Sequence, residues 1–133
     1  MIVDSSALVA VLLNEEDGAS LSRAMDDPEI VRMSAASYLE TSIVIDKYRD
    51  AVLSAKLDDM ILDSEIAIEP VTVEQAKIAR QAYRDYGRGS GHKANLNFGD
   101  CFSYALARVK REPILSKGDD FGHTDLRSAL DHR

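Results

Sequence analysis

Short apolar segments alternate with longer helical segments along this chain, and this alternation restricts the fold more than any other feature of the sequence. The short segments are Met1–Val3, Ile30–Met33, Ile66–Ile68 and Ile114–Ser116. Their length and apolar character are typical of strands. Strands that alternate with helices favour a mainly parallel sheet covered by helices. We therefore expect an α/β fold with three layers, α/β/α.

Helical patterns fill most of the chain between these strands. The expected helices are a segment that Ser5 and Ser6 can cap and that carries Leu8 to Leu13, followed by Asp17–Met25, Ala35–Tyr48, Val52–Leu62, Thr72–Tyr86 and Asp100–Lys110. In the helix from Ala35, the side chains of Leu39, Ile43 and Val44 are expected to point inward. Gly87–Gly91 is expected to be a flexible loop. The tail from Gly118 is expected to form a loop and short turns, and its sequence also allows a weak strand at Thr124–Leu126.

Length and composition indicate one ordinary globular domain. A chain of 133 residues suits a single core, and no linker or repeat divides it, so residues 1–133 are treated as one domain. No apolar run approaches the roughly 20 residues that span a bilayer. The opening Met1–Asp4 lacks the basic start of a signal peptide. We expect a cytoplasmic protein, and the single Cys101 agrees because it has no partner for an internal disulfide.

The formal net charge of −7 has two interpretations. An acidic surface without any nucleic-acid role is the simpler one, because phosphate binding usually requires a basic surface. In the other, several acids gather in one metal site whose cation reverses the local charge. Charge alone does not separate the two, but the positions of the acids do.

Acidic residues recur where an open parallel sheet places its sites. Asp4 ends the first strand, Glu40 lies two turns into a helix, Asp100 begins another helix, and Asp119 and Asp120 follow the last strand. Each acid alone is explained as well by a helix cap, an exposed position or a turn. Together they are expected at the carboxyl ends of the strands, where α/β sheets bind ligands.

Carboxylates without a set of soft ligands suit a hard cation such as Mg²⁺ or Mn²⁺. Such an ion can activate water and stabilise a phosphate under attack. The histidines at 92, 123 and 132 lack the spacing of a zinc site. Gly87–Gly91 lacks the preceding strand and the following Lys-Ser/Thr of a phosphate-binding loop.

Four motifs in order resemble those of PIN domains, and of VapC-type toxins in particular. They are Met1–Val9, Ser37–Glu40, Asn97–Ala105 and Ile114–Phe121. The resemblance extends over essentially the whole chain. It implies a PIN-like fold and Mg²⁺-dependent endoribonuclease activity, with Mn²⁺ as a substitute. It also implies a homodimer and inhibition by a cognate VapB-type antitoxin.

The resemblance further implies that Asp4, Glu40, Asp100 and an acid near position 119 form the pocket, with Asp4 and Asp100 as metal ligands. It assigns the Ser6 hydroxyl to hold Asp4, although a simple helix cap is an equal explanation for Ser6. The last acid departs from the usual pattern, because Gly118 occupies the place where many relatives carry it.

Between the two candidates for the fourth acid, the sequence favours Asp119. Gly118 allows a sharp turn after the strand, so that the next side chain can point back over the strand end. Asp120 precedes Phe121, whose ring is expected to anchor the turn in the core. Asp120 is then expected to cap the short turn through Gly122.

Basic side chains flank the third and fourth motifs: Arg84, Arg88, His92, Lys93 and Lys117. They are candidates for contacts with RNA phosphates near the metal, and solvated surface positions explain each of them equally well.

Three other functions use the same residues. One is a nuclease that cuts DNA in place of RNA. The second is a phosphoryl-transfer domain with Asp4 as nucleophile, for which the acid usually found two residues later is here Ser6. The third is a PIN domain that only binds, which the presence of all four acidic regions argues against.

Overall fold

The computed structural model describes residues 1–130, and its strands form one all-parallel sheet in the order β3-β2-β1-β4. The strands are β1 (Ile2–Val3), β2 (Arg32–Ser34), β3 (Ala67–Glu69) and β4 (Ile114–Leu115). The four expected strands are therefore confirmed, with ends shifted by one or two residues. The tail forms turns, as expected, and Thr124–Leu126 does not form the strand that the sequence allows there, although an isolated bridge joins Ile114 to Ser128.

Six α-helices and one short 3₁₀ helix complete the described residues. They are α1 (Ser5–Leu12), α2 (Gly18–Ala24), α3 (Ala35–Asp46), α4 (Ala51–Asp63), α5 (Val73–Tyr86), α6 (Phe98–Lys110) and η1 (Asp120–His123). The helix expected from Asp100 begins earlier, because Asn97 caps it. Asp4 caps α1 in place of the expected serines, since α1 follows β1 without a loop. No helix in residues 1–130 combines the length and the apolar character that a membrane span requires.

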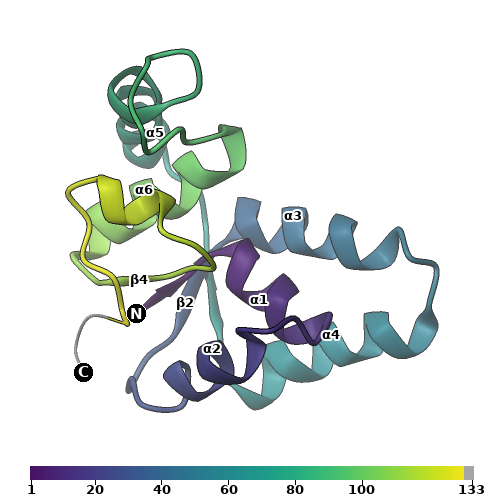
Figure 1. Cartoon of the computed structure of the whole chain (residues 1–133). Helices are drawn as coiled ribbons and strands as arrows, with labels where there is room; N and C mark the ends of the chain where they lie inside the picture. The colour runs from purple at the N-terminus through teal and green to yellow at the C-terminus, as the bar shows by residue number, and fades with distance from the viewer. Residues whose placement is uncertain (131–133) are drawn as a thin grey trace.

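Helices cover both faces of the sheet, which confirms the expected three-layer α/β fold (Figure 1). The alternation of side chains along each short strand divides the core in two. In β1, Val3 packs in the cluster that contains Leu8 and Leu21 from α1 and α2. Its neighbour Ile2 packs with Leu106 of α6 on the opposite face.

The expectation for the inner face of α3 was wrong. Leu39 and Ile43 are 59% and 58% exposed, whereas Ser37, Thr41 and Ile45 are buried. These three residues are spaced four apart and therefore share one side of the helix. The buried hydroxyls are satisfied, because Thr41 Oγ1 donates to the Ser37 carbonyl at 2.8 Å and Ser37 Oγ lies 3.0 Å from Ser103 Oγ of α6. An apolar stripe of α3 consequently faces outward.

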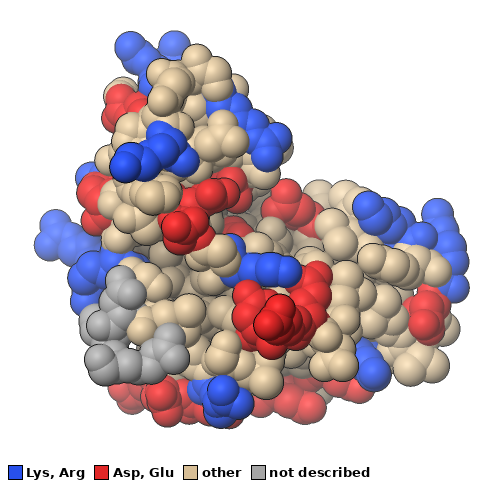
Figure 2. Space-filling view, in the orientation of Figure 1, with Lys and Arg blue, Asp and Glu red and all other residues tan. Residues whose placement is uncertain are grey.

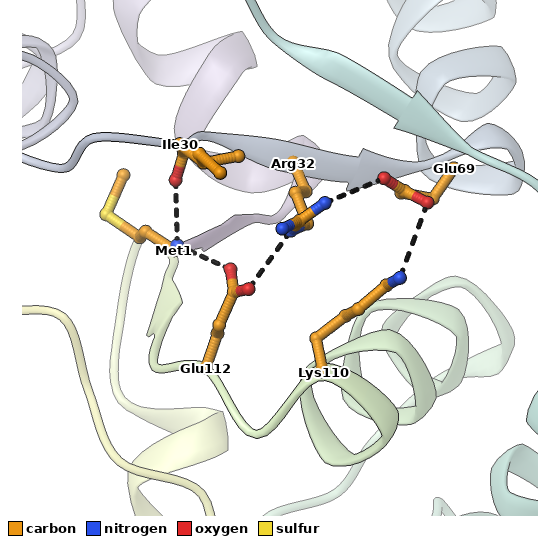
Figure 3. A network of polar contacts seen from close by, with 6 residues as sticks. All are labelled: Met1, Ile30, Arg32, Glu69, Lys110 and Glu112. Atoms are coloured by element: carbon orange, nitrogen blue, oxygen red, sulfur yellow. Dashed lines mark hydrogen bonds and ion pairs between the residues drawn. The ribbon is translucent and has the colours of Figure 1, made fainter.

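A network of ion pairs joins the starts of β1 and β2 to Glu69, the last residue of β3, and to the end of α6 (Figure 3). The Arg32 guanidinium contacts Glu69 at 3.1 Å and Glu112 at 3.0 Å. The amino group of Met1 lies 2.7 Å from Glu112, and Lys110 Nζ lies 3.7 Å from Glu69. These contacts join β1, β2 and β3 to the end of α6. The edge where the strands end carries the acidic residues of the candidate site.

Candidate active site at the carboxyl ends of the strands

Asp4 is the most constrained acid of the site. Its side chain follows β1 directly, and the residue is only 2% exposed. Ser103 Oγ donates to Asp4 Oδ1 at 2.5 Å, and the Ser6 backbone N–H donates to Asp4 Oδ2 at 3.0 Å. Because Ser103 gives its only proton to Asp4, Ser37 must be the donor in its own contact with Ser103. This relay of hydroxyls fixes the Asp4 carboxylate in one orientation.

Glu40 extends from α3 over the first turn of α6. Its Oε1 accepts a hydrogen bond from Ser5 Oγ at 2.6 Å. A Cβ atom added at Gly99 would lie 2.7 Å from both Cδ and Oε1 of Glu40, and closer still to Oε2. Any side chain at position 99 would therefore displace the Glu40 carboxylate. Glycine is required here because the carboxylate lies against the backbone of α6.

Asp100 lies in that same first turn and is held by a capping box. Its Oδ2 accepts from the Asn97 N–H at 2.9 Å, while its own N–H donates to Asn97 Oδ1 at 2.8 Å. Burial raises the pKa of Asp100 to about 6, against the lowering effect of the Asn97 hydrogen bond. The negative charges of Asp4, Asp120 and Glu40 raise this pKa further. The fold thus brings together Asp4, Glu40 and Asp100, as the sequence predicts.

The loop after β4 places its two acids differently. Gly118 adopts a φ of +80°, which gives the expected sharp turn. The Asp119 side chain is 86% exposed, and its Oδ2 lies 3.6 Å from His123 Nε2. Asp120 is the acid of this loop whose charge acts on Asp100. Phe121 is buried as expected, but Asp119 and not Asp120 occupies the cap position of η1, and no side-chain cap bond forms.

Ser6 supports the site in a different way from the one expected. Its hydroxyl accepts from the Lys117 backbone N–H at 3.0 Å and so joins α1 to the loop after β4, while only its backbone N–H holds Asp4. The hydroxyls that do hold the acids, those of Ser5 and Ser103, were not predicted. Ser103 comes three residues after Asp100, and this helical spacing is the signal that indicates a shared face.

The basic residues near the site differ in their surroundings. Arg84, Arg88 and Lys93 are exposed and make no ion pair within residues 1–130. His92 has a structural role, because its Nδ1 accepts from the Ala94 N–H at 3.0 Å and its ring packs on Tyr86 at 4.9 Å. Lys117 forms an ion pair with Glu15.

The donor set of the site fits a hard cation. The acids of the site offer only carboxylate oxygens as ligands. At Asp4, each carboxylate oxygen accepts a single hydrogen bond, which leaves that oxygen a second lone pair for a metal ion. No three His, Cys, Asp or Glu side chains among the described residues lie close enough to enclose a metal ion. Mg²⁺ does not need such a cage, because it keeps several waters and is held by one or two carboxylates.

Comparison with known proteins shows the family to which this chain belongs. The profile of the PIN-domain family matches residues 1–126. Ribonuclease VapC28 of Mycobacterium tuberculosis is 56% identical to this chain over 133 residues, which is the full length of both. Ribonuclease VapC42 of the same species is 47% identical over 129 residues, covering 97% of this chain and 98% of that protein.

Solved structures share the fold at low sequence identity. The toxin VapC20 of Mycobacterium tuberculosis superposes with a TM-score of 0.73 at 20% identity, covering 94% of this chain and 95% of that one. The FitAcB structure from Neisseria gonorrhoeae gives a TM-score of 0.71 at 17% identity, covering 96% and 94%. With a family profile over nearly its whole length and relatives above 40% identity, this chain belongs to the PIN-domain family and, within it, to the VapC group.

Proposed function

We propose that this protein is the ribonuclease toxin of a toxin–antitoxin pair and that it hydrolyses RNA phosphodiester bonds with Mg²⁺ held by Asp4 and Asp100. The observation that carries the proposal is the position of Asp4 and Glu40 against the start of α6, where Ser103 donates to Asp4 and Gly99 lies against Glu40, in the same turns that carry Asp100. The full-length relative named ribonuclease VapC28 supports the choice of RNA. Nucleases of this family are generally metal-dependent.

The chain's own residues supply orientation and a proton acceptor. Asp4 is fixed by Ser103 and Ser6, so its carboxylate is presented in one direction without a loss of entropy during the reaction. Glu40 lies at the edge of the cluster and is held by Ser5, where its carboxylate is suited to orient a water and accept its proton. When bound, the ion supplies charge neutralisation at the phosphate and lowers the pKa of water.

We further propose Asp120 as the fourth acid, in place of Asp119, which the sequence favours. Asp120 acts electrostatically on Asp100, whereas the exposed Asp119 faces His123 at 3.6 Å. Gly118 has a positive φ, and Asp120 begins η1 directly before the buried Phe121.

The proposed partners are RNA, a cognate VapB-type antitoxin and a second copy of this chain. The acidic pocket suits an Arg or Lys side chain of the antitoxin, which would compete with the metal. The exposed apolar stripe of α3, with Leu39 and Ile43, is suited to a protein interface and supports the homodimer. Sedimentation at micromolar concentration should give the mass of a dimer. A monomer that recovers no partner from the source cell would contradict this part of the proposal.

Expression of single variants tests the proposed function. Asp4→Asn, Glu40→Gln and Asp100→Asn should each abolish toxicity while the far-ultraviolet circular dichroism stays unchanged. The purified wild type should cut RNA and leave DNA of the same sequence intact. If all three variants fold and remain toxic, the assignment of the pocket is wrong. If the wild type cuts the DNA and not the RNA, the substrate class is wrong.

A further inference from the structure

A largely apolar hollow of about 680 Å³ lies between α5 and α6, next to the acidic cluster. Its walls include the aromatic rings of Tyr83, Phe98 and Phe102, and two arginines, Arg80 and Arg88, also line it. A volume of this size is within the range of pockets that bind small planar ligands. The proposed reaction, as described above, uses none of these five side chains.

Phe98 is the most unusual residue of this hollow. It is 79% exposed although it is large and apolar. Its ring packs edge-to-face on Phe102, with centroids 4.9 Å apart and an interplanar angle of 85°. This contact orients the ring at the mouth of the hollow and leaves most of its surface in solvent. An oriented, exposed aromatic ring is suited to stack against another flat ring.

The charge around the hollow is opposite to that of the whole protein. Residues 73–97 carry five basic and two acidic side chains, in a chain of net charge −7. Within residues 1–130, neither Arg80 nor Arg88 has an ion-pair partner. Figure 2 shows Lys and Arg side chains gathered over the α5 end of the molecule, beside acidic side chains at its centre. This part of the surface is therefore complementary to a phosphate chain.

The hollow and the acidic cluster share the first turn of α6. Phe98 and Asp100 are two residues apart in α6, so their side chains lie on different sides of the helix, with Gly99 and the Glu40 carboxylate on the side away from Phe98. Asn97 also lines the hollow, and its side-chain nitrogen makes no hydrogen bond within the described part of the chain. No acid lines the hollow, so a ligand that fills it would reach the acids only by passing around the first turn of α6.

We propose that the hollow between α5 and α6 binds an unpaired nucleobase of the RNA, with Phe98 as the stacking platform and Arg80 and Arg88 on the flanking phosphates. This inference rests on the proposed ribonuclease function. Single-stranded RNA is recognised through bases that leave the stack and pack on aromatic or guanidinium planes. The free amide of Asn97 is positioned to donate to a base edge. RNA is favoured over a protein partner because rings and unpaired cations occur together here.

The absence of tryptophan from the sequence makes a direct test possible. Phe98→Trp introduces a single tryptophan at the mouth of the hollow, and its fluorescence can be excited separately from that of the five tyrosines. Val73→Trp is the matched control, because Val73 is 73% exposed on α5 and does not line the hollow. Each protein is titrated in EDTA, which prevents cleavage, with a short unstructured RNA oligonucleotide. A parallel titration uses an abasic ribose-phosphate oligomer of equal length.

We expect the RNA to quench the fluorescence of Phe98→Trp and the abasic oligomer not to, while Val73→Trp responds to neither. In fluorescence anisotropy, Phe98→Ala should raise the Kd for the RNA by about 5- to 100-fold, which is the effect of losing one base–aromatic stack. Phe98→Leu keeps an apolar side chain but has no ring, and its Kd for the RNA should rise to a similar extent. Val73→Ala should bind as the wild type does.

Equal quenching by both oligomers, no quenching, or an unchanged Kd for Phe98→Ala would overturn the base site. Loss of dimerisation or of antitoxin binding in Phe98→Ala, with the RNA Kd unchanged, would overturn it in favour of a protein interface. Failure of the proposed function has a separate signature. In that case the wild type cuts no RNA in Mg²⁺, whether or not the Phe98 variants bind the RNA oligonucleotide more weakly.

Discussion

Gly99→Ala tests whether the position of the Glu40 carboxylate matters for catalysis. The new methyl group would lie 2.7 Å from Glu40 Cδ, where ordinary van der Waals contact begins at 3.4 Å. The carboxylate must therefore retreat by somewhat less than about 1 Å, and by more at Oε2. A displacement of about 1 Å can reduce a rate about 100-fold when it misaligns a catalytic group. We expect a loss of cleavage of about that size.

The same substitution should have little effect on stability. Loss of the Ser5–Glu40 hydrogen bond, which is 2.6 Å long, costs about 1 kcal/mol. Replacing glycine by alanine within a helix contributes about 0.5–1 kcal/mol in the opposite direction. The free energy of unfolding in urea should therefore stay within about 1 kcal/mol of the wild type. The predicted result is a folded protein with impaired cleavage.

Gly122→Ala is the matched control, because the added methyl group would meet its nearest neighbour, Asp119 Cβ, at 3.9 Å. Cleavage of a fluorogenic RNA should be unchanged in this control. A second comparison uses the double variant Gly99→Ala/Glu40→Ala, which should be no slower than Glu40→Ala alone because both changes act on one group. Full activity of Gly99→Ala would refute the reasoning.

Three further predictions concern the acids. The pKa of Asp100, about 6 in the fold against 3.8 ordinarily, means that its ionised form destabilises the metal-free protein at neutral pH. Asp100→Asn should thus stabilise it there by about 1 kcal/mol, after allowance for solvent screening, with the gain shrinking as the pH falls from 6 to 4 in thermal melts; a gain that grows on acidification would contradict this. Asp120→Asn should weaken Mn²⁺ binding in calorimetry more than Asp119→Asn does, and the reverse order would restore Asp119 as the fourth acid. Ser103→Ala should cost about 1–3 kcal/mol in urea unfolding, because Asp4 is 2% exposed and loses a partner; unchanged stability would show that water replaces the hydroxyl.

The order of strands and helices could be predicted because each strand lies in or beside a short segment with apolar residues that ends at a polar residue or a helix cap. β1 and β4 illustrate this, since Asp4 and the Ser116–Gly118 turn end them where the sequence changes character. The inner face of α3 could not be predicted from hydrophobicity. Ser37 and Thr41 are buried because Ser103 and the helix backbone satisfy their hydroxyls, and those partners are distant in the sequence or invisible in it.

The acids of the site likewise divide into those that the sequence could predict and those that it could not. The positions of Asp4 and Asp100 were predictable because Asp4 follows a strand and Asp100 lies at the start of a helix, whereas Glu40, in the second turn of α3, was expected from its resemblance to a PIN-domain motif. Asp120, which we propose as the fourth acid, could not be chosen over Asp119, because the surroundings of both depend on the backbone turn at Gly118 and on η1. The requirement for glycine at position 99 became visible only when α3 and α6 were placed together, since Glu40 is far away in the sequence.

The most direct test of the central claim is RNA cleavage by the purified protein as a function of divalent metal. Protein treated with EDTA should cut no RNA, and added Mg²⁺ or Mn²⁺ should restore cleavage in the wild type. Asp4→Asn, folded by circular dichroism, should stay inactive at every metal concentration because it lacks the carboxylate that Ser103 and Ser6 orient. Full cleavage in EDTA, or wild-type cleavage by Asp4→Asn, would contradict a reaction that depends on a carboxylate-bound metal.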